Sequence, residues 1–508
     1  MRMKKDILKY FLWTFCATIW VALCFILPDF ADNPVEDWHT IATISTYVIA
    51  ISGASWGIIY LLGLNKYVAW ITLPLFGAIG AGVSYFRVAF HATITPMIID
   101  ATLHTNSGTI SGVVSWLLIV WIVVNVLIAI GLVAWRERNI VLQKTWLHAL
   151  FAFLFIILYY NAHWHLKSAI NQRYPYNIVH SFIEYKKQQQ EILAERSVLP
   201  YQVVSIPDSI EVVLVLGEAL RADHLSLNGY KRETCPRLSE RKNVVSMPHI
   251  YSEYTYTATS VPQILTPADS LHLGMAGTYH SFIQTYNSCG FSSAWISNQD
   301  DGRTYTAFIH EADTVIFPNA AKSSYVFDPW YDETMIPIVD TLMKNNHSAR
   351  QLYVLHTIGS HWYYDLHVPP QWQIFHPMTT NRIITHNEPE HVINSYDNTV
   401  VYMDVFLDSL ITLFEDRNAI LLYLSDHGEA LGDDGEWLHA GYASPLHNPA
   451  CIIWYSDLYA QLFPEKIQAL IVNQNKRYRT DFFYHSVLSA VGIQAEGDYS
   501  SLDIFSIN

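Results

Sequence analysis

Residues Glu211–Arg221 have the sequence EVVLVLGEALR, which carries the strongest strand pattern in the chain. Its first part is an unbroken apolar run of valine and leucine, which is typical of a strand buried on both faces of a parallel sheet. Gly217 and Glu218 follow the run directly. Because open α/β sheets bind their ligands at the carboxyl ends of the strands, Glu218 stands at a predicted binding edge.

A second stretch, Ala419–Glu429, repeats this design with the sequence AILLYLSDHGE. Here Asp426 and His427 follow the apolar run. If both runs are strands of one parallel sheet, Glu218, Asp426 and His427 reach the same edge. Carboxylate and imidazole groups are zinc ligands, and a catalytic zinc ion keeps one coordination position open. The two stretches together therefore predict a metal site.

The region from Pro207 to Asn508 alternates buried apolar runs with helical patterns. This alternation predicts one large α/β catalytic domain with a largely parallel central sheet. Within it, Val392–Phe414 has the apolar spacing of a helix. The expected strands are Val212–Leu216, Ser293–Ile296, Gln351–His356, Ile420–Leu424 and Ala450–Trp454.

More polar side chains collect after these strands. Thr255 and Thr257 lie in a hydroxyl-rich turn with the sequence YTYTATSVP, His361 lies in HTIGSHW, and His439 lies in GEWLHAGY. A hydroxyl beside a metal cation loses its proton more readily and becomes a usable nucleophile. The turn around Thr257 is therefore a possible source of the nucleophile.

Each of these residues also has a purely structural interpretation. Glu218 or Asp426 can cap a following helix, because an acid near a helix N-terminus is stabilised by the helix dipole. A single histidine such as His427 or His439 can equally be a hydrogen-bonded surface residue. Only the combination of Glu218 with the DHGE sequence favours the metal site.

The first third of the chain has the composition of a membrane domain. The whole sequence is 51% hydrophobic, and the excess lies in this region. Five segments reach the length of about 20 apolar residues that a helix needs to cross a bilayer. They are Ile7–Leu27, Ile41–Leu64, Tyr67–Phe86, Val113–Trp135 and Trp146–Trp164. We therefore expect a five-helix transmembrane domain over residues 1–165.

Positive charge orients these segments. Lys4 and Lys5 precede the first segment, and Arg136, Arg138 and Lys144 lie in the fourth loop. Cytoplasmic loops carry an excess of lysine and arginine, so we expect a cytoplasmic N-terminus in a bacterial inner membrane. Five crossings then place the catalytic domain in the periplasm. The first segment lacks a small-residue cleavage site, which favours a retained helix over a signal peptide.

Two connecting regions carry further expectations. The amphiphilic loop Arg87–Gly112 predicts a surface helix in the lipid headgroup layer. The alternative is that Asp100, Thr102 or Asn106 lines a headgroup site. Residues 166–206 are expected to bridge the two domains through linker and interfacial helices, including a polar helix at Phe182–Arg196.

The charge of the chain bears on its binding partners, and its cysteines bear on whether it contains disulfides. The net charge of −15 argues against a nucleic-acid partner, which requires a basic surface. The five cysteines form no CxxC pair. A Cys235–Cys289 disulfide is conceivable outside the cytoplasm, but their spacing alone does not support it.

Longer motifs around these residues match a known family. The chain resembles the phosphoethanolamine transferases that modify lipid A and related outer-membrane glycolipids, within the alkaline phosphatase–sulfatase superfamily. The resemblance extends over essentially the whole chain, including the five membrane segments. The motifs that carry it are VLGEALRADHLSLNGYKRETCPRL, TATSVP, LHTIGSH, SYDNTVVYMD and YLSDHGEALGDDGEWLH.

The resemblance implies one or two zinc ions, with Glu218, Thr257, Asp426 and His427 as metal ligands. Thr257 is also the implied nucleophile. The resemblance further implies a substrate-binding set, of which two histidines also act in catalysis. This set consists of Thr255, Asn298, Arg303, His361 and His439, with His361 and His439 as the catalytic pair.

Three features depart from the family pattern. Ala219 stands where the family usually has threonine, so a hydrogen bond behind the metal ligands is missing. Ala440 follows His439 where the family commonly has glycine. Most of the family's periplasmic cysteines are also absent, so the stability of this domain must come from packing.

The activity implied by the resemblance is transfer of phosphoethanolamine from phosphatidylethanolamine to lipid A or a related lipopolysaccharide glycan. The route is a covalent phosphothreonine intermediate in a monomeric membrane enzyme. The added amine caps a negative phosphate, which implies weaker binding of cationic peptides such as polymyxin.

Other functions stay open from the sequence. The enzyme could transfer another headgroup, such as phosphoglycerol, to a periplasmic glycan. It could also be a membrane-tethered phosphodiesterase or sulfatase, although the C/S-x-P-x-R motif of sulfatases is missing near Thr257. A catalytically silent lipid-binding scaffold would have no need of the set Glu218, Thr257, Asp426 and His427.

Overall fold

The computed structural model describes residues 2–30, 38–90, 93–96, 99, 116–269, 271–272, 275–299, 301, 304–320, 329–381 and 384–507. The chain forms two compact units. One comprises Met1–Lys186 with Ala320–Asp328, and the other comprises Lys187–Asn319 with Pro329–Asn508. The predictions made for Asp100, Thr102, Asn106 and Arg303 lie outside the described residues.

The first unit contains, among its described residues, five helices long and apolar enough to cross a membrane. They confirm the five predicted segments, with ends shifted by a few residues. The first is Lys5–Phe30, most of which lies in α1 (Arg2–Val21), and the third is Lys66–Val88, which lies within α3 (Lys66–Phe90). The second, fourth and fifth are α2 (Trp38–Gly63), α6 (Trp116–Asn139) and α7 (Thr145–Ala162).

Some polar side chains inside this unit form hydrogen bonds with other helices, as is common in membrane domains. The indole nitrogen of Trp20 donates to Asn125 Oδ1 at 3.0 Å, and both side chains are buried. The Arg136 guanidinium donates to the carbonyl oxygens of Gly63 and Leu64 at 3.0 and 2.8 Å. Each bond joins segments that are far apart in the sequence.

After the last of these helices the chain continues through α8 (Lys167–Asn171) and α9 (Tyr176–Ile192). The second helix confirms the predicted polar helix, although it begins and ends earlier in the sequence than Phe182–Arg196.

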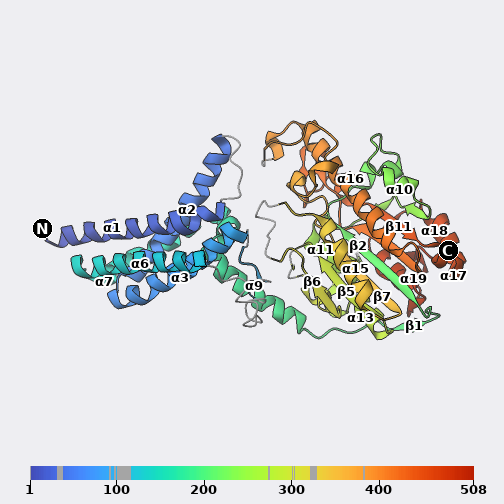
Figure 1. The fold of residues 1–508 in the computed structure, drawn as a ribbon, viewed down its shortest axis with the longest axis horizontal. Coiled ribbons are helices and arrows are strands. Elements are labelled where there is room, and N and C mark those ends of the chain that lie inside the picture. Colours follow the sequence, from blue (N-terminus) through green and yellow to red (C-terminus); the bar gives the residue numbers. More distant parts are fainter. Residues whose placement is uncertain are drawn as a thin grey trace. The chain divides into compact units, whose positions relative to one another are not determined.

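The second unit is built on β2 (Ile210–Gly217), the strand formed by the apolar run that precedes Glu218. Among the described residues its main sheet has the order β3-β11-β8-β2-β7-β5-β6. The other strands are β3 (Val244–Ser246), β11 (Cys451–Tyr455), β8 (Ala419–Ser425), β7 (Arg350–His356), β5 (Ser292–Ser297) and β6 (Thr314–Ile316). Figure 1 shows β2, β7, β5 and β6 side by side.

The sheet confirms the predicted fold class. β2 pairs in parallel with both β7 and β8, and β5 pairs in parallel with β7 and β6. The strand predicted at Ala450–Trp454 is present as β11, but it runs antiparallel to both of its neighbours. β3 and β6 were not predicted, because three residues are too few to give a recognisable pattern.

Helices cover both faces of this sheet. Val212, Leu214 and Leu216 of β2 belong to a core with side chains of α11 (Thr257–Leu265), α13 (Phe282–Ser288) and α19 (Phe482–Ala490). Val213 and Val215 belong to a second core with side chains of α15 (Ile336–Asn345) and α16 (Pro389–Phe414). Burial on both faces explains why the apolar run of β2 is continuous rather than alternating.

Smaller elements complete the second unit. The helices are α10 (Pro236–Glu240), α12 (Met275–Thr278), α14 (Thr306–Ile309), α17 (Asp457–Leu462) and α18 (Pro464–Asn473). The strands are β1 (Tyr201–Val203), β4 (Ile250–Tyr251), β9 (Ala430–Leu431), β10 (Trp437–Leu438), β12 (Tyr478–Arg479) and β13 (Ile493–Ala495). All five cysteines lie in the described part of the chain and all are free thiols, so the fold is held by packing.

Candidate metal centre

The register of the central strands brings the predicted ligand loops together. β2 pairs with β8 so that Gly217 lies opposite Ser425, and therefore Glu218 and Asp426 leave the sheet at the same edge. On the other side of β2, His356 ends β7 opposite Leu216. The loop with His361 thus starts at this edge as well.

Asp426 fixes the turn that follows β2. Its Oδ1 accepts the backbone N–H of Ala219 at 3.1 Å and that of His427 at 2.8 Å. Ala219 has a φ of 54°, in the left-handed region that residues with a side chain rarely adopt. The bond from Ala219 helps to hold this turn and leaves Oδ2 of Asp426 for another partner.

His427 has a defined tautomer. Its Nδ1 lies 2.7 Å from the carbonyl oxygen of Gly428, which can only accept a hydrogen bond. Nδ1 therefore carries the proton, and Nε2 presents a lone pair. This is the arrangement in which a histidine binds a metal ion through Nε2.

Glu218 is buried, and of its two carboxylate oxygens only Oε2 accepts hydrogen bonds from the described residues. Oε2 accepts hydrogen bonds from Thr257 Oγ1 and from Gln299 Nε2, both at 2.9 Å. Burial, together with the Asp426 carboxylate, raises the pKa of Glu218 well above its usual range. A cation beside the two carboxylates would favour their charged forms.

Glu218 Oε1, Asp426 Oδ2 and His427 Nε2 are buried and have no hydrogen-bond partner within the described residues. His427 Nε2 lies 3.6 Å from Glu218 Oε1 and 3.3 Å from Asp426 Oδ2. Ligands about 2.0–2.1 Å from a tetrahedral zinc ion lie about 3.3 Å from each other. Leaving such atoms unpaired costs about 1–3 kcal/mol each. Their spacing and chemistry thus fit a single bound zinc ion.

Two further histidines lie beside these atoms. A ring nitrogen of His439 falls within 4.8 Å of ligand atoms of both Glu218 and His427. Burial works against the charged form of His439, but the carboxylates of Glu429, Glu218 and Asp426 outweigh it and raise its pKa to about 9. The His361 ring is centred 5.9 Å from the His439 ring.

His361 differs from His439 in the direction of its pKa shift. Burial and the neighbouring His439 lower the pKa of His361. Its Nδ1 lies 2.6 Å from the carbonyl oxygen of Trp362, which holds the ring in place. The pKa values of the two neighbouring histidines are therefore shifted in opposite directions.

The hydroxyl-rich turn lies against the same group of side chains. Thr257 is the first residue of α11, and its hydroxyl reaches Glu218. Thr255 instead supports the loop that carries His439, because its hydroxyl donates to Gly441 O at 3.2 Å and its carbonyl accepts the N–H of Ala440 at 2.8 Å.

Ala440 has a φ of 63°, a conformation that glycine adopts at no steric cost. This backbone geometry gives a physical reason for the glycine that the resemblance leads one to expect at this position.

The structure does not bring the Asn298 side chain to the metal ligands. Asn298 is fully buried, and its Nδ2 donates to Tyr331 O at 3.2 Å and to Asp332 Oδ1 at 2.9 Å. Its Oδ1 accepts from Asn319 Nδ2 at 2.7 Å. Both polar atoms of the amide thus brace neighbouring loops.

The next residue, Gln299, reaches the site in its place by donating to Glu218. The sequence reasoning missed this glutamine. Its position just after β5, at the carboxyl edge of the sheet, is the signal that could have found it.

Comparison with known proteins identifies the family to which the chain belongs. A family model described as Sulfatase matches residues 211–493, and one described as phosphoethanolamine transferase EptA/EptB matches residues 55–189. The chain is 27% identical over 547 residues to phosphoethanolamine transferase EptA of Escherichia coli strain K12, covering 99% of this chain and 97% of the relative. Phosphatidylethanolamine transferase Mcr-1 of Escherichia coli is 26% identical over 441 residues, or 80% of this chain and 81% of the relative.

Solved structures agree with the fold. The soluble domain of lipooligosaccharide phosphoethanolamine transferase A from Neisseria meningitidis matches with a TM-score of 0.53 and 26% identity, over 60% of this chain and 94% of that one. The integral membrane protein from the same organism matches over 97% of both chains, with a TM-score of 0.53 and 22% identity. Because the Sulfatase match spans more than half of the chain, and relatives match its membrane part as well, the protein belongs to the sulfatase family as one of its phosphoethanolamine transferases.

Proposed function

We propose that the protein transfers phosphoethanolamine from phosphatidylethanolamine to lipid A or a related lipopolysaccharide glycan. The observation that carries the proposal is the convergence of Glu218 Oε1, Asp426 Oδ2 and His427 Nε2 beside the Thr257 hydroxyl. The names of the relatives support the chemistry, since EptA and Mcr-1 are phosphoethanolamine and phosphatidylethanolamine transferases.

Glu218, Asp426, His427 and Thr257 are the proposed ligands of the zinc ion. When bound, zinc supplies charge neutralisation for the phosphoryl oxygens and makes a neighbouring hydroxyl more acidic. Thr257 is also the first residue of α11, and the N-terminus of a helix favours an anion such as the phosphoryl group.

In the first half of the reaction, Thr257 Oγ1 attacks the phosphorus of phosphatidylethanolamine and the bond from phosphorus to the diacylglycerol oxygen breaks. Glu218 Oε2, which already accepts the hydroxyl hydrogen, receives the Thr257 proton. Despite the burial of His439, the Glu429 carboxylate 3.5 Å away raises the pKa of this histidine, and His439 supplies the proton for the diacylglycerol oxygen. Phosphoethanolamine is then bound to Thr257.

In the second half, a phosphate or sugar hydroxyl of the acceptor attacks the same phosphorus and Thr257 is released. His439, now neutral, takes up the proton of an attacking hydroxyl, or a proton from solvent when a phosphate oxygen attacks, and the proton held by Glu218 returns to Thr257. A covalent route divides one difficult displacement into two easier ones. His361 stays neutral beside His439 and adds no competing positive charge.

The membrane context fits two lipid substrates. The five candidate spans anchor the enzyme in a membrane that contains the donor lipid. Inner-membrane insertion with a cytoplasmic N-terminus and a periplasmic catalytic unit completes the proposal, and a monomer suffices because all proposed site residues lie in one chain.

A substitution at Thr257 tests the proposal. We expect Thr257→Ala to abolish transfer while zinc content stays close to that of the wild type, because three ligands remain. Thr259→Ala is the matched control, since Thr259 lies on the same helix and its hydroxyl donates only to Tyr256 O in the part of the chain described. Mass spectrometry of lipid A from cells expressing each variant measures the outcome. Phosphoethanolamine that persists on lipid A in Thr257→Ala cells would exclude Thr257 as nucleophile.

A further inference from the structure

The turn Ala219–Arg221 carries Glu218 into the site, and its backbone is held by side chains from distant parts of the chain. The Leu220 N–H donates to Ser425 Oγ at 2.8 Å, next to the bond from Ala219 to Asp426. Two more hydrogen bonds join this backbone to a single side-chain hydroxyl. Tyr396 Oη accepts the N–H of Arg221 at 2.8 Å and donates to the carbonyl oxygen of Ala219 at 2.7 Å.

These two hydrogen bonds bracket the strained part of the turn. Ala219 adopts its left-handed conformation at a cost in free energy, so a turn without external support would relax. Relaxation at Ala219 would redirect the peptide that follows Glu218. By holding groups on both sides of Leu220, the Tyr396 hydroxyl opposes that relaxation.

Tyr396 itself has little freedom to move. It lies on α16 and is fully buried. Its ring makes edge contacts with His224 and Tyr364, with ring centres 5.2 and 5.3 Å apart. Tyr364 in turn donates its hydroxyl to Glu429 Oε1 at 2.8 Å.

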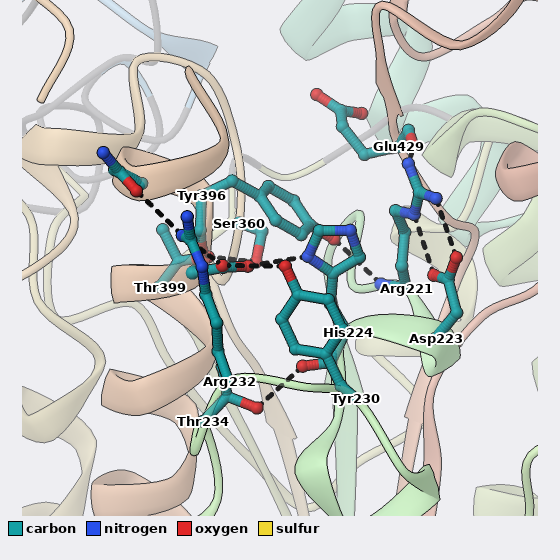
Figure 2. A network of polar contacts seen from close by, with 12 residues as sticks. Arg221, Asp223, His224, Tyr230, Arg232, Thr234, Ser360, Tyr396, Thr399 and Glu429 are labelled. Carbon is teal, nitrogen blue, oxygen red and sulfur yellow. Dashed lines mark hydrogen bonds and ion pairs between the residues drawn. The ribbon is translucent and has the colours of Figure 1, made fainter. Parts of the chain in front are cut away.

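The His224 contact is fixed by a buried carboxylate. Asp397 accepts from His224 Nδ1 at 2.6 Å, from Tyr230 Oη at 3.0 Å and from Arg232 Nη1 at 2.8 Å. The Tyr230 ring also stacks on His224 at 4.5 Å. Figure 2 shows this network beside Tyr396 and the Arg221 backbone. The network therefore anchors the ring whose hydroxyl supports the metal-ligand turn.

We propose that Tyr396 is a positioning residue of the metal centre. Its hydroxyl fixes the turn Ala219–Arg221 in the shape that directs Glu218 Oε1 toward Asp426 Oδ2 and His427 Nε2. This inference rests on the metal binding in the proposed function, and it assigns Tyr396 no contact with metal or substrate.

Zinc affinity tests the assignment without relying on activity. The purified full-length protein competes with a chromogenic chelator for zinc, and Tyr396→Phe removes only the hydroxyl. Loss of a group that orients a metal ligand weakens affinity by about 10- to 100-fold, and we expect a change of that size. Tyr459→Phe is the control, because Tyr459 is also fully buried and its hydroxyl donates to Ala490 O at 2.7 Å, in another part of the unit. It should keep the wild-type zinc affinity.

Two additional measurements separate positioning from general stability. Saturating zinc should restore most of the transfer rate in Tyr396→Phe, because every side chain proposed to touch the metal or substrate remains. Ser425→Ala removes the other hydroxyl that holds this turn and should weaken zinc binding to a similar degree.

Wild-type zinc affinity in Tyr396→Phe would overturn the inference, whatever Ser425→Ala shows, as would an equal loss in Tyr459→Phe. Failure of the wild-type protein to bind zinc would instead contradict the proposed function itself. The two failures are therefore distinguishable.

Discussion

Gly359→Ala is expected to disturb the metal centre by steric contact alone. A Cβ atom at Gly359 would lie 2.9 Å from the carbonyl oxygen of Glu218, 3.0 Å from its backbone nitrogen and 3.1 Å from its Cβ. None of these atoms is the end of a flexible side chain, so the backbone of the metal ligand must move. Overpacking of this kind costs about 1–3 kcal/mol. Gly359 also has a φ of 50°, where alanine costs about 1–2 kcal/mol more.

Gly290→Ala isolates the steric part of this effect. Gly290 also has a positive φ, 82°, but a Cβ atom there would meet nothing within 4 Å. Both variants bear the conformational cost, and only Gly359→Ala bears the contact with Glu218. The difference in their free energies of unfolding should therefore be about 1–3 kcal/mol.

Urea unfolding followed by tryptophan fluorescence measures the stability of both variants, and chelator competition measures their zinc affinity. We expect Gly359→Ala to lose more stability than Gly290→Ala and to bind zinc more weakly than the wild type. Gly290→Ala should keep wild-type zinc affinity. Equal stability losses with unchanged zinc affinity in both variants would refute the reasoning.

Two further predictions concern metal and pH. Free zinc at about 100 times its dissociation constant should stabilise the folded protein by about 2.7 kcal/mol. Chelation should therefore lower the melting temperature of the wild type and have a smaller effect on Glu218→Gln; equal effects on both would contradict the ligand assignment. Burial lowers the pKa of His485 to about 4 from an unfolded value of about 6.5, so the unfolded state binds more protons between these pH values. Stability should fall by up to about 3 kcal/mol as pH drops from 6.5 to 4, and His485→Phe should lose less stability over that range in urea titrations; an unchanged pH profile would show that His485 does not contribute.

The fold was largely predictable because its main elements carry strong local patterns. The apolar runs at Val212–Leu216 and Ile420–Leu424 are buried on both faces. Because both runs consist of hydrophobic residues alone, the sequence predicts this burial. The direction of β11 was not predictable, because a short buried run reads the same in parallel and antiparallel pairing.

The site was predictable to the extent that it follows from the strand ends. Parallel strands carry Glu218 and Asp426 to one edge of the sheet regardless of side-chain detail. Gln299 and Tyr396 were missed, because the bonds that define their roles join side chains and backbone far apart in the sequence. Asn298 directly follows β5, but which way its side chain turns depends on loops whose packing the sequence pattern does not specify.

Capture of the covalent intermediate tests the central claim most directly. Zinc-loaded protein is incubated with phosphatidylethanolamine in detergent micelles without an acceptor, quenched in acid, digested and sequenced by mass spectrometry. We expect phosphoethanolamine on Thr257 of the wild-type protein, and none on this peptide in Thr257→Ala. Phosphoethanolamine on a different residue, or transfer that proceeds while Thr257 stays unmodified, would contradict this claim.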